Sequence, residues 1–315
     1  MRVTVIGCGR WGTFLAWYLD RLGHSARLYG RECSRHIQAL MQTRSNDLLT
    51  LPETVGLTCA LNDDSEVYFI SVDSQGLRSL LREHAQALRG KPLVLCMKGL
   101  EIGTGCRLTE VVRQELGENQ PVAVWVGPGH VQEFTRGVPN CMVIDSADET
   151  LKTWLVDALS GELIRFYYGR DLIGSEIGAA SKNVVGIAAG VLDGLGLSTL
   201  KGALMSRGTR EVARLIRALG GNELSAYGLC HLGDYEATVF SPYSHNRRFG
   251  ECVATGQPYA ELAEGYYTVK ALMDLEAKTS VELPISRAVY QVLYKNADVR
   301  ETLDGLFRRS LKMEF

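Results

Sequence analysis

The first dozen residues hold the feature that most constrains the fold. An apolar run, Val3–Ile6, is followed at once by glycines at positions 7, 9 and 12 and by the helix-like stretch Gly12–Leu22. A G-x-G-x-x-G spacing between a strand and a helix is typical of a loop that binds the pyrophosphate of a dinucleotide. Gly7 permits the tight turn, Gly9 removes a side chain where the pyrophosphate approaches, and Gly12 lets the helix pack against the strand.

The rest of the first half repeats this alternation of short apolar runs and helical patterns. Strand-like runs recur at Ala26–Tyr29, Val67–Val72, Leu93–Met97, Val122–Val126 and Cys141–Ile144. Helical periodicity is found at Gln75–Leu88, Arg107–Leu116 and Glu149–Leu159. Strands that are apolar throughout and separated by helices indicate a parallel sheet covered on both faces.

The pattern changes near Asp171, after which the sequence is helix-compatible as far as Leu219. The segment GSEIGAASKNVVGIAAGVLDGLG is crowded with glycine and alanine, and small residues let helices approach closely. We therefore expect a buried central helix there. The predicted fold class is α/β, with an N-terminal Rossmann-type doubly wound sheet over residues 1–170 and an all-helical C-terminal domain over residues 171–315.

Composition and cysteine usage narrow the class of protein. The formal net charge is −2, so the basic excess typical of nucleic-acid binding is missing. No window approaches the roughly 18 apolar residues of a membrane span. The eight cysteines form no C-x-x-C pair and no zinc spacing with histidine, so no metal site is predicted. Reduced thiols in a cytoplasmic protein are the expectation.

The end of the second expected strand bears on the choice of nucleotide. NAD enzymes usually place an acidic residue there for the ribose hydroxyls. This chain has Tyr29, Gly30 and Arg31 instead, and Glu32 is displaced from that place. An arginine suits a 2′-phosphate, which favours NADP over NAD as the cofactor. Alternatively, Arg31 is a solvated surface charge or stacks on the adenine.

Two lysines are candidates for chemistry next to a redox cofactor. Lys98 ends the apolar run LVLCMKG, and open α/β sheets bind ligands at the carboxyl ends of their strands. Lys182 lies among small residues beside Asn183, where loss of hydration would lower the pKa of its amine toward the working range. Such an amine would take up the alcohol proton during oxidation and return it during reduction. The competing interpretation of either lysine is a snorkelling surface residue.

A third candidate cluster lies in the segment GDYEATVFSPYSHNRRFG. Its Ser244, Asn246 and Arg247 are residue types that bind a small phosphate through charge-assisted hydrogen bonds. Asp234 is placed to orient a lysine. Taken singly, arginines in a polar loop are usually only solvated. The lone histidines show no ligand spacing and are interpreted as structural: His24, His36, His84, His130 and His231.

Together these segments resemble the NAD(P)-dependent glycerol-3-phosphate dehydrogenases of bacteria. The resemblance is carried, in the family's order, by GCGRWGT, CMKGLE, VGPGHVQE, AASKNVVGIAAGVLDGLG, ALMSRGTREVARL, HLGDYEATVFSPYSHNRRFG and AEGYYT. It implies a Rossmann domain, a helical second domain and a site in the cleft between them. It also implies a homodimer that interconverts sn-glycerol 3-phosphate and dihydroxyacetone phosphate with NADP or NAD and supplies phospholipid synthesis.

The same resemblance assigns roles to individual residues. Lys182 would be the proton acceptor, assisted by Lys98 and Asp234. The substrate would be bound by Lys98, Gly127, Lys182, Asp234, Ser244, His245, Asn246 and Arg247. The cofactor would be bound by Gly7, Gly9, Arg10, Trp11, Gly12, Arg31, Lys98, Val131, His245 and Glu264.

Three positions depart from the family pattern around the expected pocket. His245 stands where the family usually has an arginine that contacts phosphate and cofactor, and Arg247 would have to compensate. Gly129 stands where a serine or threonine is usual, and Ser198-Thr199 replaces a usual asparagine. A histidine is shorter and only partly charged near neutral pH. These changes predict a weaker phosphate affinity or an altered substrate.

Two other functions therefore stay open at the level of sequence. One is a dehydrogenase of a β-hydroxyacid or another carboxylated compound, because guanidinium groups bind carboxylate and phosphate alike. The other is a catalytically inactive dinucleotide sensor that kept the fold. The presence of Lys98, Lys182 and Asp234 together argues against the sensor, since binding alone needs no proton transfer.

Overall fold

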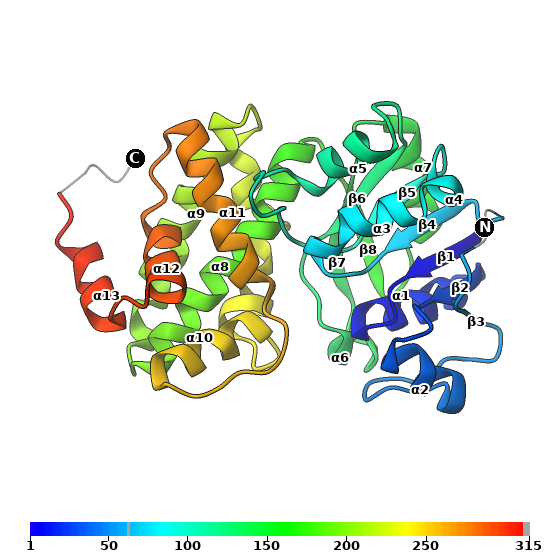
Figure 1. Ribbon diagram of the computed structural model, residues 1–315, viewed down its shortest axis with the longest axis horizontal. Coiled ribbons are helices and arrows are strands. Elements are labelled where there is room, and N and C mark those ends of the chain that lie inside the picture. The colour runs from blue at the N-terminus through cyan, green and yellow to red at the C-terminus, as the bar shows by residue number, and fades with distance from the viewer. Residues whose placement is uncertain (62–63, 311–315) are drawn as a thin grey trace. The chain divides into compact units, whose positions relative to one another are not determined.

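The computed structural model describes residues 1–61 and 64–310, which form two compact units. The first unit contains residues 1–98 and 106–176, and the second contains residues 99–105 and those from 177 onward. The first is an α/β unit and the second is helical, as the fold class predicted from the sequence (Figure 1). The loop 99–105, which the expected domain ranges did not separate, packs with the second unit: Gly103 N donates to Asp274 Oδ2 at 2.9 Å.

The first unit is built on one eight-stranded sheet. Its strands are β1 (Arg2–Ile6), β2 (Ser25–Tyr29), β3 (Gly56–Thr58), β4 (Val67–Ile70), β5 (Leu93–Leu95), β6 (Val122–Val126), β7 (Asn140–Asp145) and β8 (Ile164–Tyr168). Their spatial order is β3-β2-β1-β4-β5-β6-β7-β8. The first six strands have the order of the dinucleotide-binding fold, whose ligands bind where the strand order reverses, here between β1 and β4.

The pairing departs from the expected all-parallel sheet at one place. β6 and β7 are antiparallel, while every other neighbouring pair is parallel. A parallel return needs a crossover of a dozen or more residues, usually a full helix. The connection from Val126 to Asn140 contains only the one-turn helix α6 (Val131–Phe134), so the chain turns back beside the strand it has left.

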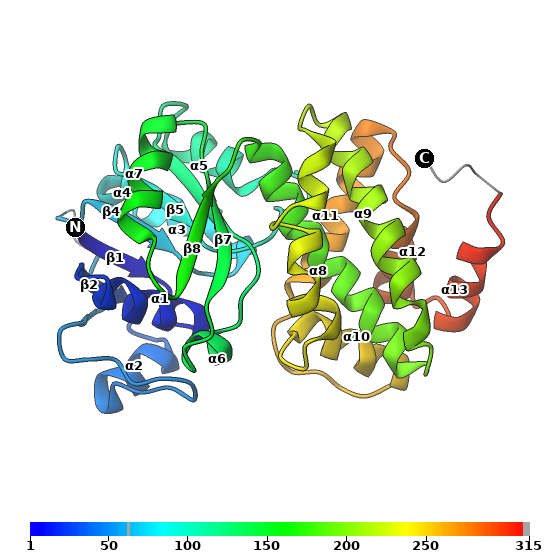
Figure 2. The same ribbon diagram turned by 180° about the vertical axis from the view of Figure 1, so that it is seen from behind.

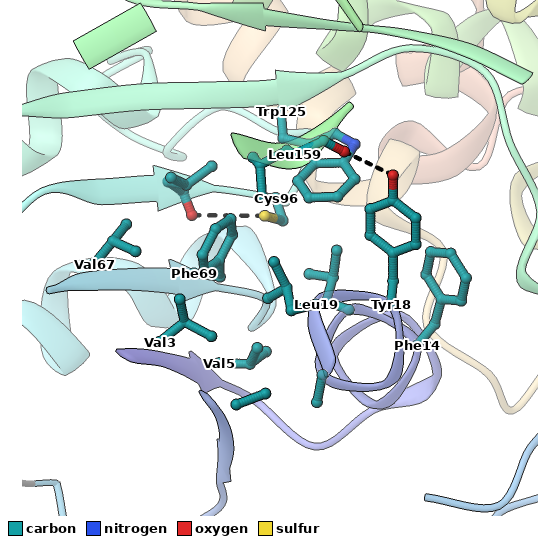
Figure 3. Close-up of a cluster of buried hydrophobic side chains, with 14 of the residues drawn as sticks. Val3, Val5, Phe14, Tyr18, Leu19, Val67, Phe69, Cys96, Trp125 and Leu159 are labelled. Atoms are coloured by element: carbon teal, nitrogen blue, oxygen red, sulfur yellow. Dashed lines mark hydrogen bonds between the residues drawn. The ribbon is translucent and has the colours of Figure 1, made fainter. Parts of the chain in front are cut away.

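Helices cover the sheet and close the core of this unit. They are α1 (Arg10–Arg21), α2 (Arg35–Thr43), η1 (Ser74–Gly76), α3 (Leu77–Glu83), α4 (Ala85–Leu88), α5 (Leu108–Leu116), α6 and α7 (Glu149–Leu159). Trp125 is fully buried in the core and meets the ring of Phe69 edge-on (Figure 3). The buried hydroxyl of Tyr18 donates a 2.7 Å hydrogen bond to the main-chain oxygen of Leu159, which ties α1 to the end of α7.

The second unit contains helices only within the described residues. They are α8 (Leu172–Gly194), η2 (Ser198–Leu200), α9 (Lys201–Ala218), η3 (Glu223–Tyr227), η4 (Leu232–Asp234), η5 (Glu236–Phe240), α10 (His245–Thr255), α11 (Glu264–Thr279), α12 (Pro284–Lys295) and α13 (Val299–Phe307). None of the helices in residues 1–61 and 64–310 combines the length and hydropathy needed to cross a bilayer.

The predicted central helix is α8, which lies among the other helices of the unit (Figure 1 and Figure 2). Its small residues allow main-chain contact with α10. A Cβ on Gly190 would stand 1.8 Å from the main-chain oxygen of Arg247, and a Cβ on Gly250 would stand 2.0 Å from that of Ile187. Any larger residue at either glycine would force the two helices apart.

Candidate active site

The loop after β1 has the geometry that a dinucleotide-binding turn requires. Gly7 has a φ of +111°, and a Cβ there would stand 2.2 Å from the main-chain oxygen of Ser71. A Cβ on Gly12 would stand 1.8 Å from the oxygen of Gly7, so packing within the protein excludes larger residues at both positions. A Cβ on Gly9 would meet no atom within 4 Å. The protein leaves that position open, as expected where a phosphate approaches the main chain.

The start of α1 supplies the donors for that phosphate. The N-cap of α1 is Gly9, and no side chain bonds the first-turn N–H groups at this cap. Unsatisfied N–H groups and the positive end of the helix dipole favour an anion. The chain therefore has, at the switch point of its sheet, a loop that fits the diphosphate of NAD(P).

Two expected cofactor contacts in this loop have their side chains engaged elsewhere. The guanidinium of Arg10 forms a 2.7 Å ion pair with Asp47. The indole of Trp11 lies 5.1 Å from the ring of Phe14 and forms part of the aromatic packing of the first unit.

The position after β2 carries no acidic residue. A Cβ on Gly30 would stand 2.6 Å from Sγ of Cys8 and 2.7 Å from Cβ of Ile37, so no carboxylate fits there. The next side chain is that of Arg31, which is exposed. The end of β2 therefore carries no carboxylate for the two ribose hydroxyls at this position.

Lys98 lies where its strand predicted, at the carboxyl edge of the sheet. Its Nζ donates a 2.6 Å hydrogen bond to the main-chain oxygen of Gly127, which follows the adjacent strand β6. Val131 is buried and begins α6 a few residues later. The structure thus brings Lys98 and Gly127 into direct contact at the edge where open α/β sheets bind their ligands.

The absent hydroxyl at position 129 has a packing explanation. A Cβ on Gly129 would stand 2.4 Å from Cε2 of Phe134. The ring of Phe134 is buried and stacks on Phe14 with centroids 5.1 Å apart. A serine at 129 would displace this ring, so the glycine follows from the aromatic core and need not reflect a change of ligand.

Lys182 is the centre of a second, buried cluster, in the helical unit. Its Nζ lies 2.7 Å from Oδ2 of Asp234 and donates a 2.8 Å hydrogen bond to Oγ1 of Thr238. Lys182 is 7% exposed and Asp234 is fully buried, so this lysine is no snorkelling surface residue. Thr238 lies in the single π-helical turn η5, a local structure that occurs frequently at functional sites. Thr238 carries no sequence signal of its own, and only the fold brings it to the lysine.

His231, taken from the sequence as structural, lies beside this cluster. Its Nδ1 is 2.9 Å from the main-chain oxygen of Gly178 and its Nε2 is 2.8 Å from the hydroxyl of Tyr235. Since the carbonyl only accepts, Nδ1 carries the proton and Nε2 accepts from the tyrosine. Burial lowers the pKa of His231 to about 4, and the charge of Lys182 acts in the same direction. The imidazole is therefore neutral and holds Tyr235 against α8.

The predicted anion-binding segment forms the N-terminus of α10. Ser244 is its N-cap, and Ser244 Oγ accepts a 3.3 Å hydrogen bond from Arg247 N. The amide of Asn246 donates to Asn183 Oδ1 at 3.1 Å and accepts from Gly265 N at 2.8 Å. Asn246 therefore joins the helix of Lys182 to the first turn of α11, which begins at Glu264.

Arg247 and His245 are both held by carboxylates. Arg247 Nε forms a 2.6 Å ion pair with Asp193, which also binds Lys201 at 2.6 Å. Burial opposes ionisation of Asp193, but the hydrogen bonds from its cationic partners outweigh it and keep the pKa of this carboxyl below its usual range. His245 Nδ1 lies 2.9 Å from Glu261 Oε2. The charge of Arg247, expected to compensate for the missing family arginine, is thus largely balanced within the protein.

Comparison with known proteins assigns both units to one family. Residues 2–152 match the profile described as the N-terminus of NAD-dependent glycerol-3-phosphate dehydrogenase, and residues 171–304 match that of its C-terminus. A "Glycerol-3-phosphate dehydrogenase [NAD(P)+]" of Pelodictyon phaeoclathratiforme is 34% identical and covers 100% of this chain and 99% of its own. The enzyme of the same name from Aromatoleum aromaticum is 35% identical over 100% of both chains.

The fold leads to the same family. The crystal structure of glycerol-3-phosphate dehydrogenase from Coxiella burnetii has a TM-score of 0.91 and 30% identity, and covers 98% of this chain and 99% of its own. D-mandelate dehydrogenase with NADH has a TM-score of 0.65 at 13% identity, covers 94% of this chain and 98% of its own, and shares the fold alone. This chain belongs to the NAD-dependent glycerol-3-phosphate dehydrogenase family.

Proposed function

We propose that this enzyme interconverts sn-glycerol 3-phosphate and dihydroxyacetone phosphate with NADP or NAD, and so supplies glycerophospholipid synthesis. The observation that carries the proposal is the buried pair Lys182–Asp234, 2.7 Å apart, in a chain that also has an open glycine loop for a dinucleotide. A buried lysine of this kind can serve in proton transfer, whereas a protein that only binds the dinucleotide has no need of one. Full-length relatives named as glycerol-3-phosphate dehydrogenases support the same reaction.

The bound dinucleotide supplies or accepts the hydride. In the reductive direction, Lys182 Nζ gives a proton to the carbonyl oxygen while the hydride adds to the carbonyl carbon, which leaves a secondary alcohol. In the oxidative direction, Nζ takes the proton from the hydroxyl. Asp234 and Thr238 fix the position of Nζ through their contacts of 2.7 and 2.8 Å, so the transfer begins from a defined geometry.

Lys98 and Gly127 are proposed to bind the substrate at the edge of the sheet. The hydrogen bond between them fixes the long lysine side chain, which reduces the conformational entropy lost when a substrate binds. The phosphate group is proposed to bind at the N-terminus of α10, to Ser244, His245 and Asn246, because helix N–H groups favour an anion there. We assign Arg247 to the same pocket, with part of its charge already engaged by Asp193.

Several finer assignments belong to the same proposal. NADP is favoured over NAD because Gly30 excludes an acidic side chain and Arg31 is exposed beside it. Val131 and Glu264 are proposed as cofactor contacts on the family resemblance.

A homodimer is proposed on the same ground. Exposed apolar residues in the second unit, such as Leu224 and Leu262, support it, and sedimentation velocity tests it. A cytoplasmic location is supported by the eight cysteines, none of which forms a disulfide in the described residues.

The test is a reductase assay with dihydroxyacetone phosphate, run in parallel with NADPH and NADH. Lys182→Ala should lower kcat by about 10²- to 10⁴-fold, because it removes the proton donor. Lys270→Ala, which removes an exposed lysine of the same unit, should leave kcat unchanged. Thermal unfolding and NADPH binding of both variants show whether they fold and load the cofactor.

Three results would contradict the proposal. Undiminished turnover in Lys182→Ala would remove this lysine from proton transfer. A strong preference for a non-phosphorylated β-hydroxyacid in a substrate panel would replace the substrate while keeping the chemistry. Tight NADPH binding without turnover of any panel member would leave only a dinucleotide sensor.

A further inference from the structure

A cavity of about 840 Å³ opens in the second unit, away from the residues assigned to the reaction. Helices α8, α9, α12 and α13 line it, and most of the lining is aliphatic or aromatic. Representative lining residues are Val191, Leu204, Ile285, Val289, Leu303 and Phe307. Voids in a protein interior are normally few and about the size of a water molecule. This volume falls instead within the range of ligand sites, about 300–1,000 Å³.

The apolar face of α13 is turned to this cavity and is only partly covered. Val299, Leu303, Leu306 and Phe307 all line the cavity and follow the i, i+4, i+7, i+8 pattern of one helical face. Yet no residue of α13 is buried, and Phe307 is 67% exposed. The helix lies at the margin of its unit beside α12 (Figure 1). An amphipathic helix in this position has an apolar face that an occupant of the cavity would cover.

The charged residues at the cavity are mostly cationic. Three arginines and one glutamate are among its lining residues: Arg207, Arg214, Arg309 and Glu282. Glu282 forms a 2.9 Å ion pair with Arg309, so it is already partnered. No carboxylate in the described ranges forms an ion pair with Arg207 or Arg214. Arg214 does donate a 3.0 Å hydrogen bond to the main-chain oxygen of Glu282, and the buried carboxylate of Glu211 acts on its charge. Arg207 and Arg214 still place two neighbouring cations of α9 beside an apolar space.

We propose that this cavity binds a long-chain fatty acid, with its acyl chain against the aliphatic walls and its carboxylate at Arg207 and Arg214. Guanidinium groups bind carboxylates through paired, charge-assisted hydrogen bonds. A sugar or a nucleotide would leave most of its polar groups against hydrocarbon without partners. An uncharged hydrocarbon would leave the two arginines unused. This site is independent of the proposed reaction, because none of its lining residues is assigned to that reaction.

The experiment is calorimetric titration of the full chain with hexadecanoate, kept monomeric in solution. One saturable site per chain is expected, with affinity falling about fourfold for each methylene removed from the acyl chain. Hexadecanol, which has the same chain without the charge, should bind at least about tenfold more weakly.

Variants on one helix test the location. Ala203 lines the cavity and Ser206 does not, although both are exposed positions of α9. Ala203→Trp should therefore obstruct the cavity and abolish binding, whereas Ser206→Trp should not. Arg207→Gln combined with Arg214→Gln should weaken hexadecanoate binding by more than about tenfold. Arg300→Gln, an exposed arginine of α13 outside the lining, is the matched control. Unchanged thermal unfolding and reductase activity would show that each variant is folded.

Four results would overturn the proposal. Two are the absence of saturable binding and full binding by Ala203→Trp. The third is binding that appears only after removal of residues 311–315, which would assign the cavity to the chain's own C-terminus. The fourth is conversion of a dimer to a monomer by Ala203→Trp in sedimentation, which would make the cavity an interface between copies. Failure of the reductase assay would leave this binding experiment unaffected.

Discussion

At the scale of single residues, His231 links the surroundings of Lys182 to the stability of the protein. Its pKa falls from 6.5 to about 4 on folding, so the native state favours the neutral ring. The stabilisation this provides is fully present above pH 6.5 and is lost as the pH falls toward 4. By linkage it amounts to at most about 3 kcal/mol.

We expect His231→Asn to make the free energy of unfolding depend less on pH between 4 and 6.5. Asparagine keeps a donor near the place of Nδ1, which bonds to Gly178, and removes the titratable ring. Urea unfolding between pH 4.5 and 7.5 measures the effect. The wild-type free energy of unfolding should fall more steeply below pH 6.5 than that of the variant. Parallel curves for the two proteins would show that this imidazole is not the titrating group.

Part of this local chemistry was visible in the sequence and part was not. The residue types predicted that Asp234 orients a lysine, without saying which, and the structure pairs it with Lys182 at 2.7 Å. His231 and Tyr235 are four residues apart, a spacing that suggests contact on a helical turn. The contact of His231 with Gly178 joins positions 53 residues apart, and only the tertiary fold brings them together.

At the scale of elements, substitutions in the glycine loop test cofactor binding and the stability of the fold separately. Gly9→Ala should leave the free energy of unfolding within about 0.5 kcal/mol of wild type, because its Cβ meets no atom of the protein. The same methyl group should weaken NADPH binding by more than about tenfold, since it stands where the phosphates approach.

Gly12→Ala is the matched contrast in the same loop. Its Cβ would overlap the main-chain oxygen of Gly7 at 1.8 Å, so it should destabilise the fold by about 1–3 kcal/mol. Urea unfolding without cofactor and NADPH titration by fluorescence measure the two effects separately. A stable Gly9→Ala that binds NADPH as tightly as wild type would rule out pyrophosphate contact at that position.

The crossing of α8 and α10 gives a second contrast between two glycines. Gly190→Ala should destabilise the protein by about 1–3 kcal/mol, because its Cβ would lie 1.8 Å from the main-chain oxygen of Arg247. Gly202→Ala, at a position of α9 with no atom within 4 Å of the new Cβ, should stabilise it by up to about 1 kcal/mol. Chemical unfolding measures the free energy of unfolding of both variants. Equal changes in that free energy would argue against main-chain contact between α8 and α10.

Element boundaries were predicted best where the apolar pattern was long. Glu149–Leu159 was predicted as the helix that the structure shows. Gln75–Leu88 is instead divided at His84, whose φ of −113° and ψ of 22° interrupt the helix. The edge strand β8 was missed although Ile164 and Phe166 alternate with exposed neighbours, since its aromatic residues mask the period of two. The antiparallel return into β7 goes with a connection that contains only the one-turn helix α6, and apolar runs alone do not give the direction of a strand.

At the scale of the whole molecule, the choice of nucleotide should appear in global stability. A ligand that binds only the native state stabilises it by about 2.7 kcal/mol at a concentration of 100 times its Kd. NADPH should therefore raise the unfolding temperature more than NADH at equal concentration.

Arg31→Ala should reduce the NADPH shift to the size of the NADH shift, because it removes the guanidinium proposed for the 2′-phosphate. Arg89→Ala, another exposed arginine of the first unit, is the control and should change neither shift. Equal shifts for both nucleotides in the wild type would remove the argument for NADP, while leaving the family assignment in place.

Main-chain contact between α8 and α10 has a consequence for turnover. Lys182 stands on one helix and the Ser244–Asn246 segment at the head of the other, and neither backbone has room to slide or tilt past its neighbour. The amine and the segment proposed to bind the phosphate thus lie in one packed block, whose conformational entropy is lost during folding. In the proposed reaction, the proton donor would therefore already be in position when the substrate binds.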